Sequence, residues 1–449
     1  MKRMRFLIAN LAFLLCLIII KQADCNAQSL NRSKENTPSE LLWNKIEKLS
    51  LNVENKVIAW RRDIHQHPEL GNREFRTSKL IADHLKKLGM EVETGVAHTG
   101  AVGILKGKSE GPVIALRADM DALPVKEMVD LPFASKVMDN VNGKQVPVMH
   151  ACGHDAHVAI LMGVAEVLSQ IRNELPGTVK FIFQPAEDSN PDGIEGGAAL
   201  MVKEGVLENP KVDAILGLHV VPYPASNISY CPGGIFAAVD NFSITVKGRQ
   251  SHGALPWTGI DAIPISAQIV LGLQTIISRQ INLTEAPAFL SIGTIHGGTQ
   301  VNILAGEVKL EGTVRTFSEA MKKDIQEWIG RTAVNIAESA GATAEVSFIP
   351  GVPVVYNDPA LTELLAGTLT KVASGTGISI TRPITVGDDF AFYTQNVPGM
   401  YFLLGILPKG VDPDKSINHS PYFVVDESAM IKGIEALSHM AYTYLSGGK

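Results

Sequence analysis

The stretch Pro112–Asp121, PVIALRADMD, holds the pattern that decides the fold of this 449-residue chain. Its first five residues form an apolar run typical of a buried strand, and two aspartates, Asp119 and Asp121, come soon after. Three later apolar runs are followed by polar side chains in the same way: VKFIF (179–183) by Glu187 and Asp188, AILGL (214–218) by His219, and MYFLLGI (400–406) by His419. Helical patterns lie between the runs, as at 155–171. This alternation predicts an α/β domain with a largely parallel sheet covered by helices.

The polar side chains that follow these strands predict a metal site. In an open α/β sheet the ligand crevice lies at the carboxyl ends of the strands, so four strands bring acids and histidines to one edge. The cluster HACGHDAH (150–157) begins a helix in the same layer. Cysteine, histidine and carboxylate side chains bind divalent metals. A thiolate has lone pairs enough to bridge two ions, and a two-metal site activates water while it polarises a carbonyl.

Each of these groups also has a plainer interpretation when it is taken alone. A histidine after a strand is usually a hydrogen-bonded structural residue, and paired acids usually form turns or helix caps. Cys152 could form a disulfide with Cys231, the only other cysteine after residue 27. The metal interpretation is favoured because all the polar groups follow apolar strands at one end of the layer.

The middle of the chain has a different pattern. Residues 241–248, NFSITVKG, alternate apolar with polar side chains, which is typical of a half-exposed strand. The elements that follow are a helix (260–278), two strands (288–295 and 307–317), a helix (318–340) and a strand (344–348). The order βαββαβ predicts a ferredoxin-like domain inserted into the first one. We therefore expect a catalytic domain in two parts, 28–237 and 351–449, around an inserted domain at 238–350.

Residues 1–27 are expected to be a signal peptide. Three basic residues precede an apolar run from Phe6 to Ile20, which is short for a membrane span, and a cut is expected after Ala27. An uncleaved anchor and lipidation at Cys25 are the alternatives. Cleavage removes four basic residues and one acidic residue, so the net charge changes from −6 to −9. We therefore expect a periplasmic or secreted protein with no further membrane span and no nucleic-acid partner.

Ten motifs, in order between about residues 40 and 445, resemble those of a known family. They are RRDIHQHPELGNRE (61–74), ALRADMDALPV (115–125), MHACGHDAH (149–157), FQPAED (183–188), LGLHV (216–220), GRQSHGA (248–254), HGGTQVNIL (296–304), GTVRTF (312–317), GDDFAFY (387–393) and NHSPYF (418–423). The set is similar to that of the amidohydrolases that include hippurate hydrolase, bacterial N-acyl-amino-acid hydrolases and plant indole-acetyl-amino-acid hydrolases. These belong to a larger group of dinuclear metallopeptidases. The resemblance implies a lid or dimerisation role for the inserted domain, and a homodimer formed through it.

The resemblance also implies a role for individual residues. Two divalent ions per chain, manganese or zinc, would be held by Cys152 as bridging ligand and by His154, Asp188, His219 and His419. Glu187 would be the general base, Asp121 would orient a ligand histidine, and His252 would stabilise the oxyanion, often from the partner subunit. The alternatives are a turn residue for Asp121 and a hydrogen-bonded loop histidine for His252. Asn302 and Arg315 would grip the substrate carboxylate, with a solvated position as the alternative for Arg315. The chain departs from the family at Asp188, where glutamate is usual, so the reach of this ligand is in question. No role follows for Asp388 and Asp389.

The resemblance therefore implies a metal-dependent amidohydrolase. It would cleave the amide bond of N-acyl amino acids or short peptides with metal-activated water and Glu187 as the base. A dipeptidase or carboxypeptidase of the same dinuclear type is the alternative enzyme. A catalytically silent binding protein, suggested only by Asp188, is the alternative from another class.

Overall fold

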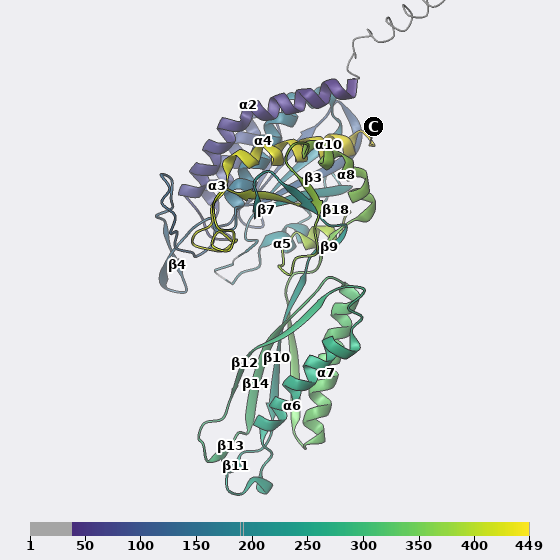
Figure 1. Cartoon of the computed structure of the whole chain (residues 1–449). Helices are drawn as coiled ribbons and strands as arrows, with labels where there is room; N and C mark the ends of the chain where they lie inside the picture. Colours follow the sequence, from purple (N-terminus) through teal and green to yellow (C-terminus); the bar gives the residue numbers. More distant parts are fainter. Residues whose placement is uncertain (1–37, 189, 192, 449) are drawn as a thin grey trace, which may run out of the picture. The chain divides into compact units, whose positions relative to one another are not determined.

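The computed structural model describes residues 38–188, 190, 191 and 193–448 (Figure 1). The expected signal peptide, residues 1–27, lies outside the described residues. The first described element is helix α2 (Pro38–Gln66), which is one continuous helix. The physical reason is that apolar residues recur every three or four positions from Leu42 to Ile64, with no glycine or proline to end the helix.

A mixed eight-stranded sheet forms the catalytic domain, with strand order β1-β2-β6-β3-β7-β18-β8-β17. The strands are β1 (Glu91–Val96), β2 (Gly100–Lys106), β3 (Ser109–Asp119), β6 (Pro176–Gln184), β7 (Ala214–Pro224), β8 (Ile228–Tyr230), β17 (Ile378–Ile380) and β18 (Gly399–Leu407). The central four, β6, β3, β7 and β18, are parallel to one another, as predicted. The flanking strands β2 and β8 run antiparallel to this centre. At the edges, β1 pairs antiparallel with β2 and β17 pairs parallel with β8, so the sheet is mixed around a parallel centre.

Helices cover both faces of this sheet. They are α3 (Phe75–Lys87), α4 (His154–Gln170), α5 (Gly197–Lys203), α8 (Pro359–Val372), α9 (Ala391–Thr394) and α10 (Met430–Leu445). Helices α4 and α10 contact each other and β3 on one face, as Figure 1 shows. Helices α5 and α9 contact each other on the other face, where residues of both join a buried apolar cluster with β3, β7 and β18. A hairpin, β4 (Met138–Val141) with β5 (Lys144–Pro147), and a short pair, β9 (Gly233–Phe236) with β16 (Val355–Asn357), complete the domain.

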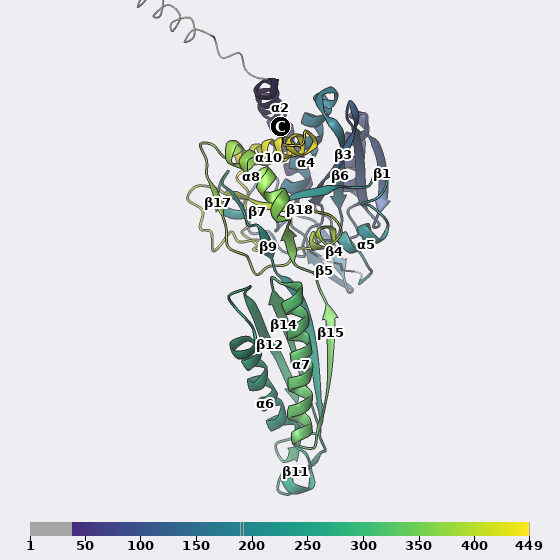
Figure 2. The ribbon, with the colours of Figure 1, turned by 90° about the vertical axis from the view of Figure 1, so that its right-hand side faces the viewer.

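The inserted segment forms a second, antiparallel sheet with the order β12-β14-β10-β15. Its elements are β10 (Ala238–Lys247), α6 (Ala262–Thr275) with a π-helical end (Ile276–Gln280), β12 (Ala288–Gly297), β14 (Glu307–Thr316), α7 (Glu319–Ser339) and β15 (Thr343–Pro350). Helices α6 and α7 lie side by side on one face of the sheet, as Figure 2 shows. The predicted ferredoxin-like βαββαβ arrangement is confirmed, while the domain limits stay predictions.

One helical stretch among the described residues, Ala262–Gln280, is long and apolar enough by composition to cross a membrane. This is weak support for a span, because Ile265, Ile269 and Leu273 of this stretch belong to the buried core of the inserted domain. A helix in the core of a soluble domain can have the same length and apolar composition.

Candidate metal centre

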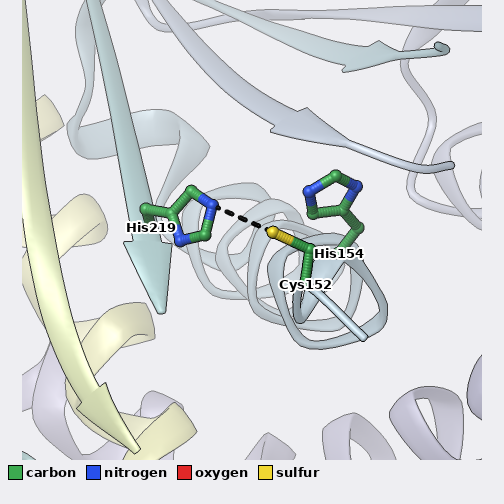
Figure 3. A group of neighbouring side chains, drawn as sticks. All are labelled: Cys152, His154 and His219. Carbon is green, nitrogen blue, oxygen red and sulfur yellow. Dashed lines mark hydrogen bonds between the residues drawn. The ribbon is translucent and has the colours of Figure 1, made fainter. Parts of the chain in front are cut away.

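Cysteine and histidine side chains converge where the central strands end. The Sγ atom of Cys152 lies 3.5 Å from Nε2 of His219 and 3.2 Å from Nε2 of His419. Figure 3 shows the sulfur between the rings of His154 and His219, with His219 on β7 and Cys152 just before α4. Two triads therefore share Cys152: one with His154 and His219, the other with Asp188 and His419. Within each triad the ligand atoms lie within 4.8 Å of one another.

Asp188 faces the same cluster. One carboxylate oxygen, Oδ1, lies 3.3 Å from Nε2 of His419, and the other, Oδ2, lies 3.6 Å from Nε2 of His154. The shorter side chain therefore still reaches the histidines. Both Nε2 of His154 and Oδ2 of Asp188 are buried atoms that have no hydrogen-bond partner. Unpaired buried polar atoms are costly, and a cation between these atoms satisfies both. The donor set and these two atoms fit a divalent metal ion held by Cys152, His154, Asp188, His219 and His419.

Asp121 orients His154 and the acid pair together. Its backbone oxygen and Oδ1 lie 2.9 and 3.2 Å from Nδ1 of His154. Both neighbours are acceptors, so Nδ1 is a donor, and Nε2 is the nitrogen that a metal would take. The Asp121 carboxylate also accepts hydrogen bonds from the amides of Glu187 and Asp188, each at 3.0 Å. The contact expected between Asp121 and a ligand histidine is thus present in the geometry.

His219 is held in a comparable way. Its Nδ1 donates to the backbone oxygen of Val220 at 2.8 Å, which turns Nε2 toward Cys152. Burial lowers the pKa of His219 to about 4, so its imidazole is neutral near pH 7, the form that binds metal. His157 lies beside it, but Asp119 and the Val220 amide occupy its two nitrogens at 2.5 and 2.9 Å. His157 is therefore a structural partner and has no nitrogen left for a metal.

The two adjacent acids have different surroundings. Burial acts to raise the pKa of Asp188, but hydrogen bonding from His419 and the nearby His154 outweigh it and hold the pKa at about 2. Burial raises the pKa of Glu187 well above its usual range, and the carboxylates of Asp388, Asp188 and Asp389 raise it further. Glu187 accepts from the Asp389 amide at 3.3 Å, and its other oxygen lies 3.9 Å from Nε2 of His154. The site thus holds one strong anion beside one basic carboxylate.

Three residues at the site have a positive φ, which places them in the left-handed region of backbone conformation. Gly153, between Cys152 and His154, has φ +91°, and a Cβ there would lie 2.2 Å from Cγ2 of Val220. Only glycine fits this position. His419 and Ala186 are non-glycine residues in the left-handed region, with φ of +69° and +49°. Such strain persists where the surrounding structure fixes it, and it clusters at functional sites.

Comparison with known proteins places this geometry in a family. Residues 115–443 match the family described as peptidase family M20/M25/M40. The chain belongs to this family. It is 40% identical over 393 residues to thermostable carboxypeptidase 2 of Saccharolobus solfataricus, covering 86% of this chain and 94% of that protein. It is 40% identical over 313 residues to an N-acyl-L-amino acid amidohydrolase of Geobacillus stearothermophilus, covering 70% of this chain and 80% of that protein.

A solved structure gives the same result. The crystal structure of Bacillus subtilis YxeP, described as a dinuclear metal binding peptidase from the M20 family, superposes with a TM-score of 0.74. It is 35% identical, and the match covers 88% of this chain and 99% of that chain. The family resemblance of the motifs is confirmed. The protein is an M20-family hydrolase, and the cluster around Cys152 is its candidate metal site.

A cavity of about 290 Å³ opens beside the candidate metal ligands. Its polar end consists of ligand residues with Glu187 and Asn418, while its remaining wall is largely apolar and includes Val221, Phe236, Val386 and Ile417. Among the described residues that line it, none is lysine or arginine. The cavity therefore suits an uncharged, apolar group attached to a polar reacting bond.

Of the three site residues expected on the inserted domain, two lie together and Arg315 lies apart from them. His252 and Asn302 are neighbours because β11 (Ser251–His252) pairs with β13 (Ile303–Leu304) and the Gly253 amide donates to the Asn302 oxygen. Both lie beyond the end of β10 that holds Lys247. Arg315 pairs with Val239, near the opposite end of β10. The eight residue steps from Val239 to Lys247 span about 26 Å. Arg315 instead donates to the Thr385 oxygen, at 2.7 Å, beside the cavity wall.

A buried ion network lies behind the metal ligands and was not predicted. Arg117, on β3, lies 2.6 Å from Asp119 Oδ2, 3.4 Å from Asp388 and 3.0 Å from Asp389. Asp389 also accepts from the Ala198 amide at 2.7 Å. The GDDF acids thus join β3 to the loop before α9. A charged Arg117 inside an apolar strand was the one signal for it, because a buried charge needs partners. Cys152 and Cys231 are both free, so the alternative of a disulfide is wrong.

Proposed function

We propose that this protein is a metal-dependent hydrolase of N-acyl amino acids, with two divalent ions, manganese or zinc, bound at the Cys152 cluster. The observation that carries the proposal is that one buried thiol belongs to two ligand triads while a basic carboxylate, Glu187, lies beside them. When bound, the ions would polarise the amide carbonyl and acidify a water. Asp188 takes the ligand position that is usually glutamate in the resembling family.

Glu187 carries the proton in this proposal. Its raised pKa suits a group that takes a proton from water and later returns it to the amine nitrogen that leaves. The Asp389 amide holds one of its oxygens, and Asp121 fixes its backbone, so the carboxylate is oriented before substrate arrives. This division of labour requires that Asp188 stay with the metal and Glu187 stay free of it.

The cavity supports an apolar acyl group as the part of the substrate that it holds. An amino acid product keeps its α-carboxylate, and a carboxylate needs a cationic or hydrogen-bonding partner. No lysine or arginine is among the described residues lining the cavity, so the amino-acid half would point out of it. The acyl half would then lie against Phe236, Val386 and Ile417. A free α-amino group would be unfavourable there, which weighs against a dipeptidase.

A hydrolysis screen with metal analysis tests the function. Residues 28–449 would be loaded with manganese or zinc and supplied with N-benzoyl, N-acetyl and free dipeptide forms of the same amino acid. We expect about two ions per chain, and kcat/KM for the benzoyl substrate at least about tenfold above the acetyl one, since about 1–3 kcal/mol follows from apolar contact. Faster turnover of dipeptides would favour the peptidase alternative. A metal-free, inactive protein would favour the silent binding protein.

We further propose that a homodimer completes the site. His252 and Asn302 are exposed and lie at the end of β10 away from Arg315, so a second copy of the chain is the natural source of these groups. Mixing inactive Glu187→Gln and His252→Ala chains is then expected to restore activity. Random exchange of subunits gives one intact site in each mixed dimer, about a quarter of the wild-type rate. Mixtures that stay as inactive as the separate variants would exclude a site shared between subunits.

A further inference from the structure

Glu74 is a buried acid that the proposed function does not use. It precedes α3 and is fully inaccessible to solvent, yet its side chain does not cap that helix. Glu69 does so instead, because its two carboxylate oxygens accept from the amides of Arg76 and Thr77, both at 2.8 Å. The Glu74 carboxyl turns the other way. Its folding role is therefore not the one that its place in the chain suggests.

The Glu74 carboxyl contacts the loop that carries the acid pair. Its Oε1 accepts from the Ala186 amide at 2.8 Å, and its Oε2 accepts from the Thr99 hydroxyl at 2.5 Å. Ala186 has φ +49°, in the left-handed region that alanine rarely adopts. With the two amides held by Asp121, three consecutive amides, from residues 186 to 188, are thus bound by two buried carboxyl groups.

This arrangement is costly for folding. Among the described residues Glu74 forms no ion pair with lysine or arginine, and burial followed by the nearby Asp121 raises its pKa to about 8. A buried acid without a cation lowers stability, so a different advantage is needed to explain it. The strained Ala186 immediately before Glu187 supplies one. A turn held at this φ sets the directions in which the next two side chains leave the backbone.

We propose that Glu74 is a positioning residue, which acts through the Ala186 amide to hold Glu187 beside the metal ligands and Asp188 among them. The inference rests on the proposed function. It depends on the reach of Glu74 as a hydrogen-bond acceptor and not on its charge. Two substitutions separate these properties. Glu74→Gln keeps an acceptor oxygen at the same distance without an ionisable carboxyl, and Glu74→Asp keeps the carboxyl but is one methylene shorter.

The test is Mn²⁺ titration by calorimetry of metal-stripped chains 28–449, together with the melting temperature and kcat/KM. Loss of a partner that orients ligands typically weakens metal binding by about 10–100-fold. We expect that loss for Glu74→Asp and near wild-type affinity for Glu74→Gln. Glu69→Ala is the matched control: it removes the cap of the same helix, so it should lower the melting temperature while Mn²⁺ affinity stays unchanged.

The outcomes separate the two proposals. Wild-type chains that bind no Mn²⁺ would contradict the proposed function itself. If wild-type chains bind Mn²⁺ but Glu74→Asp binds it equally well, Glu74 has no positioning role. Weaker binding by Glu74→Gln than by Glu74→Asp would overturn the inference too, because the ionisable carboxyl and not its reach would then be the property that matters. If Glu69→Ala loses affinity as Glu74→Asp does, the effect belongs to α3 as a whole, and the inference fails.

Discussion

Glu187→Gln is expected to lower kcat by about 10²–10⁴-fold, the usual contribution of a general base, while Mn²⁺ affinity stays within about threefold of wild type. Glutamine has the same shape and still accepts from the Asp389 amide, so the loop need not move. It cannot take a proton from water or return one to the leaving amine. Steady-state kinetics on an N-benzoyl amino acid, with calorimetric Mn²⁺ titration of the same preparation, measures both quantities.

The control for this variant is Glu195→Gln, the same substitution in the segment that connects β6 to α5 and also contains Glu187. Glu195 is exposed and its carboxylate pairs with Lys203 at 2.7 Å and not with a candidate ligand, so kcat should not change. Loss of Mn²⁺ together with kcat in Glu187→Gln would reassign Glu187 as a ligand. Turnover at the wild-type rate would remove it from the mechanism. Because a silent binding protein has no turnover to lose, the wild-type rate itself decides against that alternative.

The layers of this fold were predictable because each central strand is a short apolar run followed by polar residues. The runs at 112–116, 179–183, 214–218 and 400–406 all became parallel neighbours in the sheet. The directions of the flanking strands were not predicted. β1 and β2 are separated by only three residues, and so short a connection allows only antiparallel pairing. The limits of β7 were also wrong, since His219 lies within the strand and not after it.

The ligand cluster could be inferred from residue type and place, but its supporting contacts could not. Cys152 and His419 are 267 positions apart, and only their shared position at the strand ends indicated that they meet. Arg117 and Asp389 are 272 positions apart, with no spacing or period that links them. Glu74 resembles a helix cap in sequence, and its contact with Ala186 depends on how α3 packs. Long-range contacts of this kind are set by packing geometry, which a single sequence does not record.

Cys152→Ala is expected to remove metal binding more completely than any change behind the ligands. The thiol belongs to both triads, so its loss would take a donor from both of the proposed ions. Loss of an outer partner costs about 10–100-fold in metal affinity, and loss of a shared ligand should exceed this. The buried, metal-free thiol has its pKa raised, first by burial and then by Asp188. A bound cation reverses this effect, and the deprotonated sulfur then serves as ligand.

Metal content per chain and the melting temperature with and without Mn²⁺ measure the effect of Cys152→Ala. A ligand at 100 times its Kd stabilises the folded state by about 2.7 kcal/mol, so the wild-type melting temperature should rise with Mn²⁺ while that of the variant should not. Cys231→Ala is the matched control. Cys231 is also a buried, free thiol, but it packs in an apolar cluster and its hydrogen-bond partners are the backbone oxygens of Pro232 and Gly234. The Cys231→Ala substitution should therefore cost packing energy and leave the metal content unchanged. Full metal occupancy in Cys152→Ala would mean that the histidines and Asp188 alone form the site, and the bridging role would have to be given up.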